Sequence, residues 1–182
     1  MRISSSVIVL VFVLTALGQA ENKFVGVAKC KACHSVEKLG GLAYKVWEKT
    51  PHAQAYATLL GDAAKKIAKE KGLKTAPNES PECLKCHVTG GAMAKNVDTG
   101  FKKEDGVTCE ACHGAASAWL PIHNKKDDAS KAKAKEAGLM LGDKTGKACE
   151  NCHNAESPTH KEFSMKVMWA KIEHGLPPPP KQ

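Results

Sequence analysis

The chain has few of the residues that usually build a protein interior. Its 182 residues include only four Phe, three Trp and two Tyr, so that aromatic residues make up 5% of the sequence. Hydrophobic burial alone would stabilise a chain of this composition poorly, because a thin core leaves little favourable free energy to offset the entropy cost of folding. The composition therefore predicts that something other than ordinary side chains fills much of the interior.

Long hydrophobic runs are also scarce. The longest, Val7 to Leu17, follows the positive charge of Arg2 and precedes the small residues of Gly18-Gln19-Ala20. This order is typical of a cleavable secretory signal peptide, and the run is too short to span a bilayer comfortably. We expect a signal peptide over 1–20, a single domain over 21–182 and no stable membrane insertion. An uncleaved N-terminal anchor is the alternative.

Two function classes lack their usual signatures. The formal net charge is +8, but no aromatic residues interleave with the lysines as they do on surfaces that bind nucleic acid. We therefore expect no nucleic-acid partner. We also find no convincing set of acid, base and nucleophile such as an enzyme of group transfer requires.

What the chain has in abundance is one pentapeptide, Cys-x-x-Cys-His. Four copies occur, called here the first to fourth motif in chain order, and together they use every cysteine. The pattern is the attachment signature of a c-type haem, in which two thiols bond to the porphyrin and the adjacent imidazole coordinates the iron. The spacing places both sulfur atoms on one helical turn. The cofactor-binding residues are thus Cys30, Cys33, Cys83, Cys86, Cys109, Cys112, Cys149 and Cys152, with His34, His87, His113 and His153 as proximal ligands.

Other sites built on Cys-x-x-Cys fit less well. Structural zinc sites and thioredoxin-like proteins use the pair, but neither needs histidine directly after the second cysteine. A disulfide framework would gain little from cysteines so close in sequence, since the stabilisation grows with loop length. We therefore expect four covalently attached haem c groups (iron) to act as core elements. The haem propionates would offset much of the positive charge, and remaining lysines could attract an acidic redox partner.

The expected fold class is mainly α, with helices and loops wrapped around the haems and at most one short hairpin. Cap residues and breakers indicate the helix ends. Thr50 is a good N-cap and Gly72 and Gly175 are helix terminators, whereas the proline run makes 177–182 a disordered tail. The last helix should bury a stripe of Val167, Met168 and Ile172. The expected helices are 41–48, 51–60, 63–71, 125–137 and 161–174.

Four histidines lie outside the motifs, namely His52, His123, His160 and His174. Their number equals the number of predicted irons, each of which has a second axial face. A second histidine or a methionine makes the iron low-spin and suited to electron transfer, whereas an open face can bind a small ligand. Met140, Met165 and Met168 fit packing roles better than ligation, and Met93 stays open.

Several longer stretches resemble one family, the tetrahaem cytochromes c-554. The similarity extends from about Val25 to His174 and includes Thr50-Pro51-His52-Ala53-Gln54-Ala55, Cys86-His87-Val88-Thr89-Gly90 and the segment Gly106 to Gly114 around the third motif. His123, ten residues beyond the third motif, and the helix that ends at His174 match as well. Family members of this type accept electrons from hydroxylamine oxidoreductase.

The resemblance implies distal ligands that cross between motifs. His123 would serve the first haem opposite His34, His52 the third opposite His113, and His174 the fourth opposite His153. The second haem, held by His87, is five-coordinate in the founding member. The region after the fourth motif is shorter here, and His160, which falls inside it, has no counterpart. His160 is a surface residue in the favoured interpretation and a distal ligand of the second haem in the other.

Two functions follow as hypotheses. The first, which we favour, is a periplasmic electron-transfer protein without a substrate of its own, acting between redox partner proteins. The second is an enzyme that acts on a small nitrogen species such as nitric oxide at a five-coordinate second haem, with Lys85 or His160 as a proton donor. A gas sensor is a weaker third hypothesis, since no output domain is visible. The sequence does not indicate the oligomeric state.

Overall fold

The structure is a computed structural model that describes residues 21–91, 95–142 and 145–175. Within these ranges the chain forms helices and loops without a strand, and its extended pairing is an isolated parallel bridge between Phe24 and Val97. The mainly-α prediction is confirmed. The predicted signal peptide, the proline-rich tail and Met93 lie outside the described residues. No helix in the described ranges is long and apolar enough to cross a membrane.

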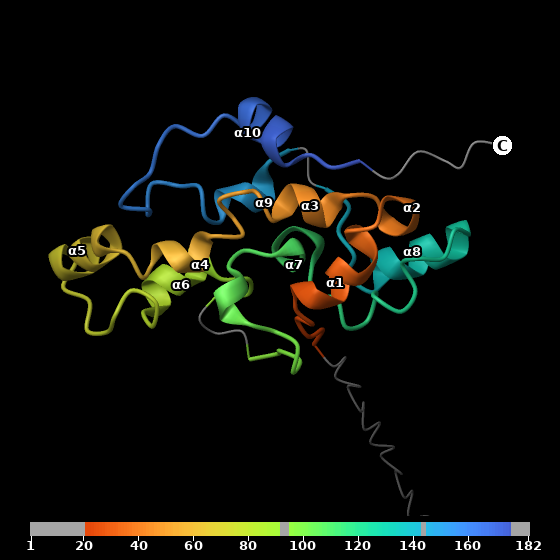
Figure 1. The fold of residues 1–182 in the computed structure, drawn as a ribbon, viewed down its shortest axis with the longest axis horizontal. Helices are drawn as coiled ribbons and strands as arrows, with labels where there is room; N and C mark the ends of the chain where they lie inside the picture. Colours follow the sequence, from red (N-terminus) through yellow and green to blue (C-terminus); the bar gives the residue numbers. More distant parts are fainter. Residues whose placement is uncertain (1–20, 92–94, 143–144, 176–182) are drawn as a thin grey trace, which may run out of the picture.

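The helices are short and lie along an elongated body, with α5 at one end and α8 at the other (Figure 1). In the lower layer of that view, α1, α7 and α6 carry the first, third and second motifs, and α3, α9 and α10 lie above them. The bounds are α1 Val27–His34, α2 Glu37–Gly40, α3 Ala43–Trp47, α4 Ala55–Thr58, α5 Asp62–Glu70, α6 Pro81–His87, η1 Lys103–Asp105, α7 Cys109–His113, α8 Asp128–Glu136, α9 Lys147–Glu150 and α10 Met165–Ile172.

All five predicted helices have a counterpart, but four of them are shorter than expected. The segment 51–54 forms hydrogen-bonded turns before α4, and the Thr50 hydroxyl donates back to the carbonyl of Trp47 instead of capping a helix. His52 therefore lies in a turn. The last helix begins at Met165, four residues later than predicted. Helix α8 begins three residues later than predicted because Asp127 caps it, accepting a 2.8 Å hydrogen bond from the Ser130 amide.

The protein side chains form two small cores instead of one large interior. One contains Val25, Ala116, Trp119 and Ala134, and the other contains Tyr56, Leu59, Leu84 and Val88. Each core joins segments that are distant in sequence, so each fixes one end of the body. Their small size agrees with the shortage of aromatic residues.

The expected buried stripe on the last helix is wrong for two of its three residues. Val167 is 53% exposed and Met168 is 36% exposed, whereas Ile172 is half-buried. The apolar pattern is real, but in the part of the chain that the structure describes the side chains of Val167 and Met168 remain largely uncovered. An apolar face uncovered by protein fits a chain whose interior is completed by another group.

Candidate functional site

The motifs begin on helices, as their spacing predicts. The first three motifs end their helices at the histidine, with α1 closing at His34, α6 at His87 and α7 at His113. The fourth begins on α9 and continues as a turn in which the amides of Cys152 and His153 both donate to the carbonyl of Cys149. None of the eight cysteines forms a disulfide. Both thiols and the imidazole of each motif therefore belong to one or two consecutive helical turns.

Backbone carbonyls orient three of the four proximal histidines. Nδ1 of His34 lies 2.8 Å from the carbonyl of Gly40, that of His87 lies 2.6 Å from Ala55, and that of His113 lies 2.8 Å from Met140. Because a carbonyl oxygen can only accept, each Nδ1 must carry the proton. Nε2 then keeps its lone pair, which is the arrangement found in metal-ligating histidines. These carbonyls were not predicted, and no sequence signal marks them.

Two of the distal candidates are held in the same way. Nδ1 of His123 lies 2.8 Å from the carbonyl of Leu120, and Nδ1 of His174 lies 2.9 Å from that of Ile172. Each bond closes within a few residues of the histidine, so the local backbone sets the ring orientation. Both rings thus present Nε2 away from their own segment.

Three proximal histidines face three of the histidines outside the motifs. The ring centres of His34 and His123 lie 6.2 Å apart, those of His52 and His153 lie 6.0 Å apart, and those of His113 and His174 lie 5.9 Å apart. The members of each pair come from distant parts of the sequence. Three such pairs with almost equal separations indicate a common cause.

The separation fits one iron between each pair. Two metal–nitrogen bonds of about 2.0–2.1 Å, with about 1.1 Å from each Nε2 to its ring centre, would set the ring centres a little over 6 Å apart. The ring planes of the three pairs meet at 22°, 77° and 60°. Such different angles are compatible with axial ligation, because each imidazole ring would be free to turn about its own bond to the metal. The described residues contain no group of three or more His, Cys, Asp or Glu that could hold a metal, as a zinc site would require.

Two of the three pairings differ from those that the resemblance implied. His123 faces His34 as expected, but His52 faces His153 instead of His113, and His174 faces His113 instead of His153. The backbone of His52 does lie against the approach to the third motif, because its carbonyl accepts a 3.0 Å hydrogen bond from the Val107 amide. The ring, however, extends from there to the fourth motif.

Gly106 makes this close approach possible. Its φ of +72° is in the left-handed region, and a Cβ there would lie 2.7 Å from the carbonyl oxygen of His52. Trp47 fixes the same segment, because its indole N–H donates a 2.8 Å bond to the carbonyl of Val107. The turn that carries His52 is therefore held against the approach to the third motif by one backbone hydrogen bond and by the indole of Trp47.

The second motif has a different environment. Among the described residues no histidine ring faces His87, whose Nδ1 also lies 3.2 Å from the hydroxyl of Thr58. His160 is exposed and close enough to His153 for its charge to lower the pKa of that ring, after the larger effect of burial. Lys85 forms an ion pair with Glu156. Neither proton donor suggested from the sequence is thus placed against His87.

Burial favours the neutral form of the ligand candidates. Desolvation lowers the pKa of His34, His52 and His113, and it does so against the opposing effect of a backbone carbonyl at His34 and His113. A facing histidine lowers these pKa values further. Neutral imidazole is the form that coordinates metals, so the lowered pKa values favour the protonation state that a ligand requires.

The four motifs form a spatial series that differs from their order in the sequence. Cys109 of the third motif lies close enough to Cys30 of the first to raise the pKa of its thiol, and Cys86 of the second motif contributes to the raised pKa of Cys152 of the fourth, after the larger effect of burial. The charge of Cys149 in the fourth motif raises the pKa of Cys112 in the third, after the larger effect of burial. The spatial order is therefore first, third, fourth, second.

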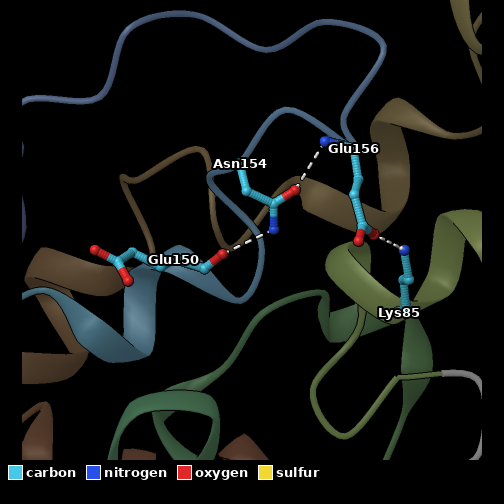
Figure 2. A network of polar contacts seen from close by, with 4 residues as sticks. All are labelled: Lys85, Glu150, Asn154 and Glu156. Atoms are coloured by element: carbon cyan, nitrogen blue, oxygen red, sulfur yellow. Dashed lines mark hydrogen bonds and ion pairs between the residues drawn. The ribbon is translucent and has the colours of Figure 1, made fainter.

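Polar contacts join the second and fourth motifs at the surface. Figure 2 shows Lys85, on α6, reaching across to Glu156 in the loop that follows the fourth motif. The amide of Glu156 donates 2.9 Å to the side chain of Asn154, which in turn donates 2.7 Å to the carbonyl of Glu150. This loop is tied to the end of α9, which positions it over α6.

Two further residues near the motifs were missed from the sequence. Trp119 is 5% exposed, and its ring contacts that of His123 edge-on with centres 5.3 Å apart. Its indole N–H is buried without a hydrogen-bond partner, which is rare in native proteins and fits a neighbouring acceptor such as a haem carboxylate. Glu110, inside the third motif, is 2% exposed. No sequence signal separates it from Glu150, which occupies the same place in the fourth motif.

Comparisons with known proteins agree with this site. The family model described as "Cytochrome c554 and c-prime" matches residues 29–114, which span the first three motifs. Cytochrome c-554 of Nitrosomonas europaea is 27% identical over 144 residues, covering 74% of this chain. The chain spans 59% of the length of that relative. No solved structure matches the chain.

The matches and the geometry point to the same chemistry. The region matched by the family model contains six of the eight thiols, three of the four motif histidines and the His52 turn, and the relative's match extends over most of the chain. Cytochromes c bind haem through cysteine thioethers and transfer electrons, as the repeated motif predicts. The chain is therefore similar to the cytochrome c-554 family over its first three motifs, and the chemistry of cytochromes c is electron transfer on covalently bound haem.

Proposed function

We propose that this chain is a periplasmic electron carrier that holds four c-type haems and acts between redox partner proteins. The observation that carries the proposal is the set of three facing histidine pairs, whose ring centres are separated by 5.9–6.2 Å. When bound, the haems supply iron centres that exchange single electrons. The chain itself contributes the histidine pairs and the spatial order of the motifs.

Histidine pairs suit electron transfer better than substrate chemistry. A pair would occupy both axial positions, so that neither face would be left for a substrate. In the pairs His34–His123 and His113–His174, Nδ1 bonds to backbone carbonyls keep the rings from turning away. His34 with His123, His52 with His153 and His113 with His174 would hold the first, fourth and third sites in this way. His87 would hold the second.

The spatial order of the motifs supports a single route through the molecule. The contact of Cys30 with Cys109, the proximity of Cys112 to Cys149 and the contact of Cys152 with Cys86 bring consecutive attachment sites together. The first and second sites then lie at the two ends of the route. We infer that donor and acceptor proteins dock near these ends, one close to α1 and the other close to α6.

Purified holoprotein tests the proposal directly. Intact-mass measurement should give four haems per chain, and a potentiometric titration followed by absorption should reach full reduction after four electrons. Rapid mixing of the reduced protein with an oxidised small c-type acceptor should reoxidise all four irons without added mediator. A chain that holds fewer than four haems, or one in which only one site reoxidises, would contradict this function.

Export to the periplasm is part of the proposal. It is supported by the charged, apolar and small-residue pattern of residues 1–20 and by covalent haem attachment, which in bacteria takes place on the periplasmic side of the membrane. The mass of protein from the periplasmic fraction should correspond to a chain that begins at Glu21 and carries its haems. Haem-loaded protein that remains in the cytoplasmic fraction would exclude export.

A second candidate function is supported by the environment of His87. Because no histidine ring in the described residues faces it, the second site could bind a small ligand such as nitric oxide. Adding nitric oxide to reduced holoprotein and following its consumption with a nitric oxide electrode separates the two functions. Binding at one site without turnover supports the carrier, whereas sustained consumption with an electron donor supports the enzyme.

A further inference from the structure

Glu110 is a buried acid at the junction of two motifs. It follows Cys109 in the third motif, and only 2% of its surface is exposed, which makes it one of the largest fully buried side chains among the described residues. Charged side chains are almost never buried to this extent without a partner. Its environment therefore needs an explanation that the attachment motif does not supply.

Three backbone amides surround the carboxylate. Oε1 accepts 2.9 Å hydrogen bonds from the amides of Val25 and Ala116, and Oε2 accepts one of 2.9 Å from the amide of Gly26. Every partner is a donor, which matches an ionised carboxylate, because that form only accepts. A protonated carboxyl group would have to direct its own O–H toward one of these N–H groups.

The negative charge is held without a cation. The ion pairs formed among the described residues do not include Glu110. Backbone dipoles stabilise the charge but do not cancel it, so a full negative charge remains in a region shielded from water. Such a charge acts on its neighbours more strongly than a surface carboxylate does, since the surroundings screen it less.

The charge lies next to two attachment sites. Glu110 is adjacent in sequence to Cys109, and Cys109 contacts Cys30 of the first motif. The charge of Glu110 raises the pKa of both thiols, although larger effects act on each. The first and third sites are therefore within its electrostatic reach.

We propose that Glu110 is a fixed buried anion that lowers the reduction potentials of the first and third haems relative to the other two. This inference rests on the proposed function. A ferric porphyrin centre carries one more positive charge than a ferrous one, so a buried anion nearby favours the oxidised state. Glu110 thereby makes the first and third sites the low-potential end of the route, and electrons move from there toward the fourth and second sites.

The fourth motif supplies a matched control. Glu150 follows Cys149 as Glu110 follows Cys109, but its side chain is exposed, and in Figure 2 its carboxylate points away from the hydrogen-bonded group around Asn154. Both E110Q and E150Q remove one negative charge with little change in size. They differ in burial, so a difference between them reports the buried charge.

The experiment is a redox titration of the holoproteins followed by electron paramagnetic resonance and absorption. In E110Q the equilibrium constant for reduction should rise about tenfold at the first and third sites. A change of this order is expected when a unit charge several ångström away in a protein interior is removed. For a one-electron couple it corresponds to a rise in reduction potential of about 59 mV. E150Q should leave these two sites within about twofold of wild type. Unshifted potentials in E110Q, or equal shifts in both variants, would overturn the inference.

A packing role is separated by E110D, which keeps the charge and shortens the side chain. Potentials close to wild type in E110D support the electrostatic role, and they decide the matter even if E110Q gives no holoprotein. A tenfold rise in E110D, where the charge is retained, would show that Glu110 acts by packing and would refute the inference. Failure of the proposed function would appear separately, as fewer than four haems in the wild-type mass.

Discussion

Replacing His123 with glycine removes the ring that faces His34, and the structure predicts a change at one site alone. The planes of these two rings meet at 22°, whereas the planes of the other two pairs meet at 77° and 60°. Nearly parallel axial imidazoles split the iron orbitals strongly and give a rhombic low-spin signal. Steeply crossed imidazoles interact with both orbitals alike and give a strongly anisotropic signal.

The oxidised wild-type protein should therefore show one rhombic and two strongly anisotropic low-spin signals. His123→Gly should abolish the rhombic signal, add one high-spin signal and leave the anisotropic signals unchanged. Adding imidazole should restore a low-spin spectrum at this site. His160→Gly is the matched control, because His160 is exposed and is not part of a facing pair, and its spectrum should equal that of wild type.

The same variant should lose stability, because the bond through His123 closes a loop of about ninety residues from His34. By the chain-entropy relation for a cross-link, closing a loop of that length contributes at most about 4–5 kcal/mol. We expect chemical denaturation to show a loss of that order or smaller in His123→Gly. Free imidazole should restore the spectrum but not the stability, because it occupies the axial position without closing the loop.

Persistence of the rhombic signal in His123→Gly would refute the pairing of His123 with His34. Loss of an anisotropic signal in its place would show that His123 serves a different site. Full recovery of stability with free imidazole would mean that loop closure contributes nothing, and that the histidine pairs act as ligands only.

Three other predictions test the framework around the sites. Gly106→Ala should destabilise the protein by more than the roughly 1–2 kcal/mol expected for a non-glycine residue in the left-handed region, because the new Cβ would also meet the carbonyl of His52. The control in the same denaturation assay is Gly72→Ala, because Gly72 has a φ of +66° but open space around it. Thr89→Val should lower the free energy of unfolding by about 1–3 kcal/mol, because it removes the hydroxyl that accepts a 2.7 Å hydrogen bond from the buried Thr108 amide. A loss of stability below the error of the measurement would contradict this role of the hydroxyl. Protein prepared without haem should lack a native helical far-ultraviolet circular dichroism spectrum, since its two cores are small, and a native spectrum would show that the haems are dispensable for folding.

Local features of the site were predictable because they depend on residues close in sequence. The spacing in Cys30 to His34 places two sulfur atoms and an imidazole on one helical turn wherever the turn is built, and the structure places that motif at the end of α1. The same holds for α6 and α7, which end at His87 and His113. The shortage of aromatic residues likewise predicted a thin core, and the two clusters among the described residues are small.

The histidine pairing could not be obtained in this way. His52 has the same neighbours in sequence whichever motif its ring faces, and its backbone does contact the approach to the third motif. The direction of its ring depends on where α9 and the fourth motif lie, about a hundred residues later in the chain. The resemblance to the family implied His113 as the partner of His52 and His153 as the partner of His174, whereas in the structure the ring of His52 faces His153 and that of His174 faces His113.

The sequence by itself determined four copies of the Cys-x-x-Cys-His motif and a mainly helical chain with little core of its own, and from these it predicts haem chemistry. These follow from short-range geometry and composition, which do not depend on the rest of the fold. Only the tertiary structure decided which histidine faces which, the spatial order of the motifs, and that Glu110 is buried while Glu150 is exposed. Those properties depend on contacts between distant segments, and identical local sequences acquire different surroundings when different segments pack against them.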